Sequence, residues 1–162
     1  MVFLHGTIIM HRSGVGHARE ARVRQVQDGD QSILEFSEYV PIGNSPSKLQ
    51  KWNIQGAEIV YLSSHLKLED VAKDKSVLRK FNFPEGEIYF RRSEEIYSDV
   101  AEKVMPDILI EDDCESIGGE DEMTYPHNSA VKRKSIKHIV VKEFEGIDHL
   151  PDDQSSLYSY AS

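Results

Sequence analysis

Five short apolar runs separated by helix-like segments are the feature that most limits how this chain can fold. The runs are VFLHGTII (2–9), AEIVYL (57–62), EIYFR (87–91), DILIE (107–111) and KHIVVKEF (137–144). Strands that alternate with helices favour a parallel sheet covered on both faces. Because crossover connections are right-handed, the order predicts a three-layer, Rossmann-like α/β fold with ligands at the carboxyl ends of its strands.

Three segments between these runs carry helix patterns. Residues 67–81 place their apolar side chains on one helical stripe. The segment that begins at Ser93 repeats apolar residues four apart, and the two glutamates after the serine predict a helix N-terminus there. Residues 45–56 predict a helix with Pro46 in its first turn and Gly56 as its stop.

The remaining segments set the domain organisation. The 162 residues predict one α/β domain over residues 1–150. About 11–39 form an insert, in which REARVRQVQDGDQ (19–31) favours a hairpin because polar residues separate its valines and DGD is a turn signal. We interpret the insert as a small flap over the sheet edge, with no large cap domain. Residues 151–162 are expected to form a polar, frayed C-terminal tail.

Three consecutive acids follow the fourth apolar run. Glu111, Asp112 and Asp113 come directly after the apolar residues of PDILIEDDCES (106–116). Adjacent carboxylates at a strand end repel one another unless a cation or hydrogen bonds compensate. Mg²⁺ takes oxygen ligands from such carboxylates together with water and phosphate. The other interpretation is an acidic start of a loop in an acidic protein, and the spacing alone does not decide between them.

At these strand ends the chain resembles the haloacid dehalogenase-like superfamily of phosphohydrolases. That family has a Rossmann-like fold with four motifs: a strand ending in Asp-x-Asp-x-Thr, a strand ending in Thr or Ser, a helical Lys, and a strand ending in paired acids. Here FLHGT (3–7) matches the first motif in part, IVYLSSH (59–65) matches the second, and ILIEDD (108–113) matches the fourth. The resemblance covers most of residues 1–150.

The resemblance also implies roles for individual residues. It implies phosphate binding by Gly6, Thr7, Ser63, Ser64 and Lys103, and binding of Mg²⁺ by Glu111, Asp112 and Asp113. The third-motif assignment stays open, because Lys103 is the only lysine on the helix before the fourth run and Ser98 occupies an equally suitable position.

The chain departs from the family in the first motif. Phe3 stands where the family has its nucleophilic aspartate, and His5 stands where it has its general acid/base. A phenyl ring can neither attack phosphorus nor ligate a metal ion, so the sequence excludes aspartyl-phosphate chemistry. Histidine transfers protons near neutral pH and can attack phosphate directly, which makes His5 the candidate catalytic residue.

Histidines and a cysteine also lie near the expected strand ends. If the first two strands are neighbours, His5 and His65 approach Asp112, where imidazole and carboxylate could together bind a divalent metal. The alternative is that these histidines only form hydrogen bonds. Cys114 follows three acids, which predicts a raised thiol pKa and argues against a nucleophilic role.

Composition limits the partners and the location. A formal net charge of -9 argues against nucleic-acid binding by phosphate neutralisation. No stretch approaches the roughly 18 apolar residues of a membrane span. A single cysteine and an N-terminus without a basic region before its apolar run predict a cytoplasmic protein. The oligomeric state is not predicted.

Three functions follow from these patterns. The first is a binding module for a divalent cation, a phosphate-bearing ligand or both, in which Mg²⁺ is the expected ion. The ligand would be a small molecule or a phosphate on a macromolecule. The second is an active metal-dependent phosphohydrolase that uses His5 or a metal-bound water. The third is a non-catalytic interaction protein.

Overall fold

The centre of the molecule is a five-stranded parallel sheet. A computed structural model describes residues 1–160 of the chain. The strands lie in the order β5-β4-β1-β6-β7, and every neighbouring pair is parallel. Their bounds are β1 (Val2–Phe3), β4 (Tyr61–Ser63), β5 (Ile88–Phe90), β6 (Ile108–Asp112) and β7 (Lys137–Val141). The predicted α/β class with a Rossmann-like parallel sheet is confirmed.

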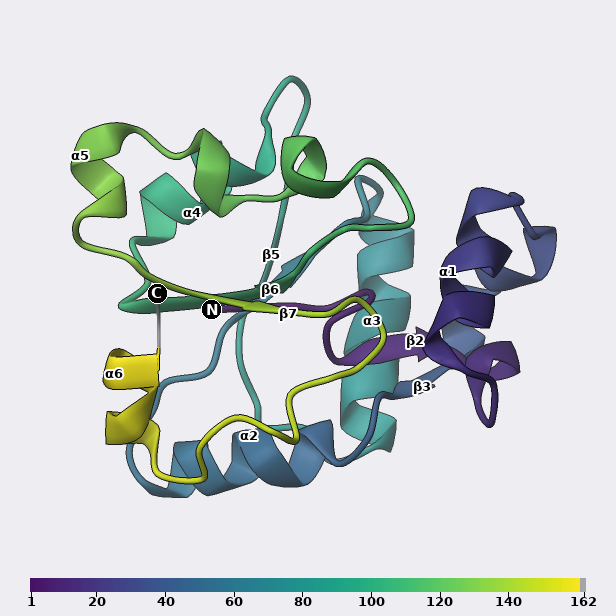
Figure 1. Ribbon diagram of the computed structural model, residues 1–162, viewed down its shortest axis with the longest axis horizontal. Coiled ribbons are helices and arrows are strands. Elements are labelled where there is room, and N and C mark those ends of the chain that lie inside the picture. The colour runs from purple at the N-terminus through teal and green to yellow at the C-terminus, as the bar shows by residue number, and fades with distance from the viewer. Residues whose placement is uncertain (161–162) are drawn as a thin grey trace.

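Helices cover both faces of this sheet, which gives the three predicted layers (Figure 1). Strand residues alternate between two cores, as the period of two requires. Val2 packs in a core with α2 and α3, whereas Phe3 packs in a second core with α4. The helices are α2 (Ser45–Ile54), α3 (Leu68–Lys80), α4 (Tyr97–Val104), α5 (Ala130–Arg133) and α6 (Leu157–Tyr160).

Two of the three predicted helices match closely, and the third begins later than expected. α2 has Pro46 in its first turn, and Gly56 follows it with φ +104°. α4 begins at Tyr97 rather than near Ser93, which adopts φ +46°. The carboxylate of Asp99 accepts a hydrogen bond from the Ile96 N–H at 2.9 Å, so the side chain that satisfies the first turn comes from inside the helix.

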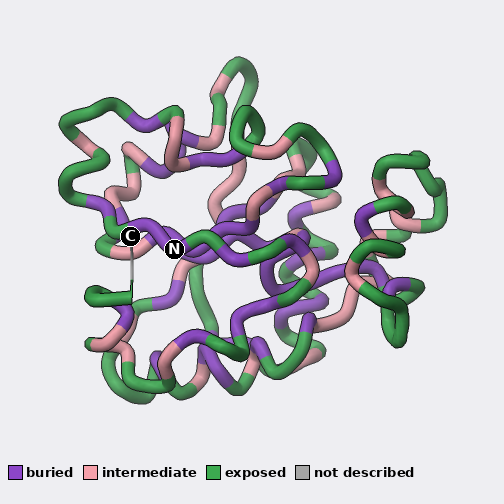
Figure 2. Tube along the Cα trace, in the orientation of Figure 1, coloured by how far each residue is buried: buried purple, intermediate pink, exposed green. Residues whose placement is uncertain are grey.

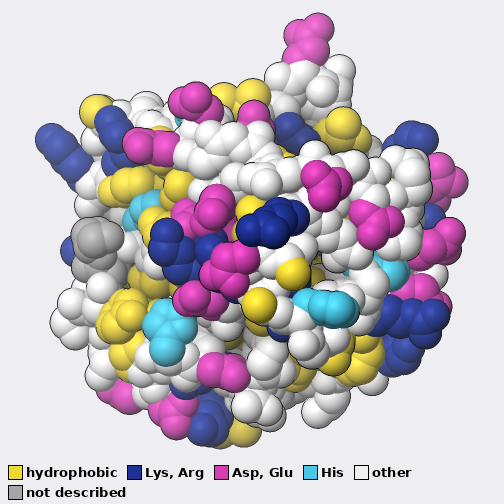
Figure 3. All heavy atoms as spheres, turned by 45° about the vertical axis from the view of Figure 1, so that its right-hand side comes forward, with side chains coloured by type: hydrophobic (Ala, Val, Ile, Leu, Met, Phe, Trp, Pro, Cys, Tyr) yellow, Lys and Arg dark blue, Asp and Glu magenta, His cyan; other side chains and the backbone are white. Residues whose placement is uncertain are grey.

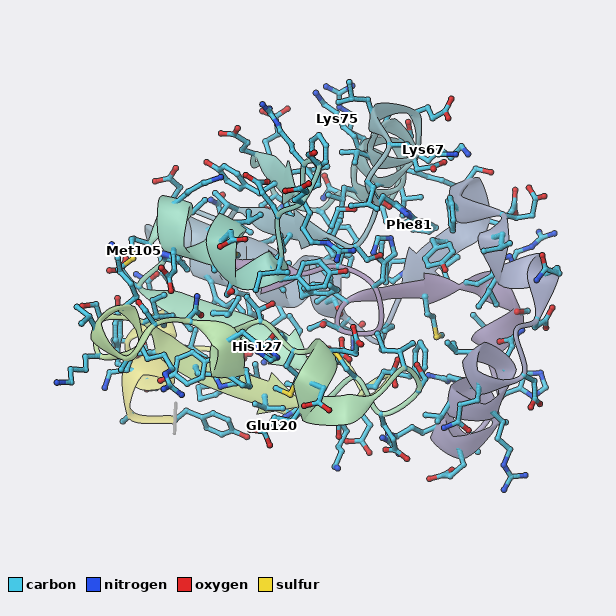
Figure 4. The ribbon with its side chains drawn as sticks, turned by 90° about the horizontal axis from the view of Figure 1, so that it is seen from above. Lys67, Lys75, Phe81, Met105, Glu120 and His127 are labelled. Atoms are coloured by element: carbon cyan, nitrogen blue, oxygen red, sulfur yellow. The ribbon has the colours of Figure 1, made fainter. Side chains whose placement is uncertain are left out.

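The predicted flap exists, but its central segment is a helix and not a hairpin. α1 (Arg19–Gln27) lies beyond the antiparallel pair β2 (Ile9–His11) and β3 (Tyr39–Pro41). Its Arg, Glu, Ala and Gln residues favour helix more than its two valines favour strand. The flap extends from one side of the sheet in Figure 1, and Figure 2 shows that much of it is exposed or half-buried. In Figure 4 it lies beside α3, which packs against the turn Phe36–Glu38 of the flap.

The segment after β7 packs on α2 instead of fraying. Lys48 donates a hydrogen bond through Nζ to the Leu150 carbonyl at 2.7 Å, and Trp52 donates through Nε1 to the Pro151 carbonyl at 2.9 Å. The Leu157 side chain is buried in the core. The expectation of a frayed tail is therefore wrong for this part of the segment, and residues 161–162 lie outside the described residues.

The surface carries charges of both signs. Figure 3 shows Asp and Glu side chains interspersed with Lys and Arg side chains on one face of the molecule. Within residues 1–160, no helix combines the length and the apolar character that crossing a membrane requires.

Candidate functional site

A pocket of about 200 Å³ lies where the flap meets the carboxyl ends of the central strands. This is the position at which Rossmann-like sheets bind ligands. The sheet side contributes polar groups that follow β1, β4, β6 and β7, and the flap contributes mainly apolar ones. The lining includes His5, Ser64, Asp112 and Glu143 from the sheet side, and Met10 and Tyr39 from the flap.

Three carboxylates cluster at the acidic edge of this site, where Asp112 and Glu143 line the pocket and Asp113 lies beside them. One oxygen from each of Asp112, Asp113 and Glu143 lies within 4.8 Å of the others. Asp112 accepts hydrogen bonds from Thr7 Oγ1 at 2.7 Å and from the Cys114 N–H at 3.0 Å. These bonds aim its carboxylate, and they leave each oxygen with a further lone pair for a ligand.

Burial and mutual repulsion disfavour full ionisation of this cluster. Burial raises the pKa of Asp112 to about 7, and the nearby carboxylate of Glu143 adds to the effect. Burial also raises the pKa of Glu143, although hydrogen bonds from Ser116 oppose the change. Burial is the largest single influence on Asp113 and opposes its ionisation, but the hydrogen bonds from Lys142 and the Glu143 N–H and the charges of Lys142 and Arg19 together lower the pKa of Asp113. The cluster would therefore gain from an additional positive charge.

Glu111 does not belong to the pocket. Its carboxylate accepts hydrogen bonds from the N–H groups of Thr124 at 2.7 Å and Tyr125 at 2.9 Å, and it lies 2.8 Å from His138 Nε2. Residues next to each other within a strand point to opposite faces, so the Glu111 side chain lies on the other face of β6 from Asp112, whereas Asp113 follows the end of the strand. This corrects the expectation that both acids bind the same cation, because Glu111 instead holds the segment between β6 and β7. His127, labelled in Figure 4, lies on the same segment.

The turn after β1 brings the chain close to the acids. Gly6 has φ +82°, a conformation that side chains with a Cβ rarely adopt. A Cβ at this position would lie 3.0 Å from Asp112 Oδ2. Gly6 therefore lets the backbone approach the carboxylate of Asp112. Thr7 is fully buried and does not line the pocket, but its hydroxyl donates a hydrogen bond to that carboxylate.

A second cluster joins the ends of β1 and β4 to α3. His5 Nε2 lies 3.0 Å from Asp74 Oδ1, and His5 Nδ1 lies 2.8 Å from Ser64 Oγ. Ser63, fully buried, donates through Oγ to Asp74 Oδ2 at 2.6 Å. Burial, with a smaller contribution from the neighbouring His5, lowers the pKa of His65 to about 4. Ser63 thus holds the Asp74 carboxylate by a hydrogen bond, whereas Ser64 and His5 line the pocket.

Other predicted positions have different surroundings. Phe3 is buried, and its ring meets the Tyr97 ring edge-on with centroids 5.1 Å apart, so this residue forms an apolar wall of the pocket. Lys103 lies on the surface, paired with Glu95, and does not line the pocket, which corrects its predicted phosphate-binding role. Burial raises the pKa of the Cys114 thiol, with Asp112 adding to the effect, as predicted.

Sequence reasoning missed two acids of the site. Asp74 interrupts the apolar stripe of α3 between Val71 and Val77, and a charged residue on a buried stripe was the available signal. Glu143 follows β7 and contributes to the acidic cluster, but the polar residues around it in the sequence do not set it apart from other surface acids. The histidine cluster was expected around Asp112, and the structure forms it around Asp74.

Comparisons with known proteins assign no family to this chain. No model of a protein family, no curated protein and no solved structure matches this chain. The geometry of the pocket therefore carries the functional conclusion.

Proposed function

We propose that this chain is a haloacid dehalogenase-like domain whose pocket binds a divalent cation and a phosphate-bearing ligand without aspartyl-phosphate chemistry. The observation that carries the proposal is that Asp112 and Glu143 line one pocket with Phe3 at the carboxyl end of the sheet, with the carboxylate of Asp113 clustered beside theirs. Acids after a central strand fit the family's fourth motif, and the aromatic ring stands where its nucleophile would be.

The donor set supports a hard cation. Asp112, Asp113 and Glu143 offer only carboxylate oxygens, which Mg²⁺ prefers. The raised pKa of Asp112 expresses the cost of its buried negative charge, and a cation would offset that cost. A bound Mg²⁺ would supply charge neutralisation for an anionic ligand.

An arginine of the flap supports an anionic ligand. Arg22 lines the pocket and donates through Nη1 to the Phe144 carbonyl at 3.0 Å. Its Nε is buried and has no hydrogen-bond partner among the described residues. A guanidinium with an unused donor suits a phosphate oxygen. Arg22 therefore extends the predicted phosphate site to the flap, in place of Lys103.

Thermal unfolding with Mg²⁺ and inorganic phosphate tests the binding proposal. We expect the pair of ligands to raise the melting temperature, and Asp112→Asn to abolish the increase because it removes a charged oxygen ligand. Glu69→Gln, an exposed change on α3, should respond as the unchanged protein does. If neither ligand shifts the transition, the binding proposal fails and a non-catalytic interaction protein becomes the better interpretation.

Phe3→Asp tests the relation to the family more sharply. A carboxylate at this position would restore the missing nucleophile beside the acids. We expect the variant to hydrolyse a phosphate monoester in the presence of Mg²⁺, as measured by phosphate release. A folded Phe3→Asp variant that binds Mg²⁺ and releases no phosphate would contradict the assignment of Phe3 to the family's nucleophile position.

A metal-dependent phosphohydrolase is the second candidate function, favoured by the surroundings of His5. Its ring lies within hydrogen-bond distance of Asp74 on one side and Ser64 on the other. A base oriented by a carboxylate can accept a proton from a hydroxyl or a water in the pocket. A phosphatase and phosphodiesterase screen with Mg²⁺ or Mn²⁺ should then show turnover that His5→Ala removes, and no turnover with either ion would exclude this function.

A further inference from the structure

One buried nitrogen beside His5 is left without a partner. The His65 side chain is 10% exposed, and its Nε2 has no hydrogen-bond partner among the described residues. This atom lies 3.6 Å from Asp74 Oδ1, and the same oxygen lies 3.0 Å from His5 Nε2. Two imidazole nitrogens therefore face one carboxylate oxygen that is itself buried.

The spacing of these three atoms fits a small metal ion. All three side chains offer ligand atoms within 4.8 Å of one another. A tetrahedral zinc ion with bonds of about 2.0 Å separates its ligand atoms by roughly 3.3 Å. The two measured separations of 3.0 and 3.6 Å bracket that value. The arrangement needs little movement to receive an ion.

We propose that His5, His65 and Asp74 form a binding site for a transition-metal ion of the zinc class. Two imidazoles with one carboxylate suit zinc and related divalent ions, and three protein ligands leave a coordination position for water or a ligand. His5 also lines the pocket at the sheet end, so the proposed site lies next to the pocket. The site differs from the all-carboxylate cluster of Asp112, Asp113 and Glu143 and does not depend on it.

The neighbouring hydroxyls support the same arrangement. Ser64 Oγ lies 2.8 Å from His5 Nδ1, and Ser63 Oγ donates to Asp74 Oδ2 at 2.6 Å. Each of these contacts uses the atom that faces away from the shared centre. Metal-binding histidines and carboxylates are commonly held in this way by a second hydrogen-bond partner.

A hydrogen-bonded His–Asp pair without metal would explain only part of the cluster. It accounts for His5 and Asp74, but it leaves His65 Nε2 buried and unsatisfied, which is unfavourable. A metal ion would satisfy that nitrogen directly. The unpartnered atom of His65 therefore distinguishes a metal site from a simple hydrogen-bond chain.

Metal titration of the chelator-treated protein tests the proposal. With Co²⁺ as the probe, we expect one equivalent to bind with the visible absorption of a four-coordinate site, and excess Mg²⁺ not to displace it. At free Zn²⁺ about 100 times Kd, the melting temperature should rise on the order of 5–10 °C. His65→Ala should weaken binding at least about tenfold. Its metal-free melting temperature should fall, because the His65 ring packs on Phe36 with centroids 4.1 Å apart, so Co²⁺ binding is compared at a temperature where the variant is folded.

Matched variants make the result decisive. His17→Ala removes an exposed histidine outside the cluster and should bind Co²⁺ as the unchanged protein does. Asp112→Asn should also keep Co²⁺ binding while it loses the response to Mg²⁺, so the two proposals fail separately. Undiminished Co²⁺ binding by His65→Ala, or absorption typical of an octahedral site, would overturn the assignment.

Discussion

At the scale of single residues, Glu111 and Asp112 are neighbours in sequence but serve different parts of the molecule. Glu111 is almost fully buried and accepts hydrogen bonds from two backbone N–H groups. In Glu111→Gln an NH₂ group would face one of those donors, so we expect a loss of about 1–3 kcal/mol of unfolding free energy. Urea unfolding with and without Mg²⁺ checks this, because the loss should be the same in both conditions. A loss of stability that appears only with Mg²⁺ would indicate that Glu111 is a ligand of the cation after all.

Asp112 should make the stability of the metal-free protein depend on pH. Its folded-state pKa of about 7 lies above its ordinary value of 3.8. Between these values the folded state binds more protons than the unfolded state, so stability falls as pH rises. Asp112→Asn removes that dependence, and the slope should change by at most about 1.4 kcal/mol per pH unit. Urea unfolding in chelator across this pH range measures the slope, and parallel curves for both proteins would contradict the expectation.

At the scale of elements, the flap is attached mainly by polar contacts. Arg19 Nε donates to the Glu143 carbonyl at 2.9 Å, and Arg22 Nη1 donates to the Phe144 carbonyl at 3.0 Å. Val23 is the one buried residue of α1, so the helix buries little apolar surface. Such an element opens more easily than the sheet.

Arg22→Ala should loosen α1 without unfolding the rest. Loss of a hydrogen bond from a charged group predicts amide exchange in residues 19–27 roughly tenfold faster, with exchange in the central strands unchanged. Hydrogen exchange followed by mass spectrometry measures this. Arg24→Ala, an exposed change on the same helix, is the control and should leave exchange nearly unaltered. Equal exchange in the Arg22 variant would show that the arginine does not hold the flap.

At the scale of the whole molecule, the segment after β7 completes the core beside α2. The side chain of Leu157 is only 4% exposed and belongs to the same cluster as Leu49 and Trp52. Leu157→Ala should therefore lower the unfolding free energy by about 2–5 kcal/mol. Chemical denaturation measures this loss, and Tyr158→Ala, a change at a half-exposed neighbour, should cost much less. A negligible effect of Leu157→Ala would mean that the segment is peripheral to folding.

Local patterns and long-range contacts contributed differently to these assignments. Pro46 and Gly56 marked both ends of α2, because their backbone restrictions act on the chain whatever surrounds it. The helix of the flap was missed, since its weak apolar pattern allowed either structure. The partner of His5 was also missed, because Asp74 is 69 residues away in the chain and meets it only when α3 packs beside the sheet.

The sequence by itself determined the alternation of strands and helices and the edge of the sheet at which polar side chains gather. It did so because hydrophobic periodicity and backbone restrictions operate over a few residues. Long-range packing, in contrast, places Glu111 on the opposite face from Asp112, brings Glu143 to the acids and turns Asp74 toward two histidines. These choices depend on strand direction, on helix packing and on which donors satisfy each buried carboxylate, and none of these is encoded in local spacing.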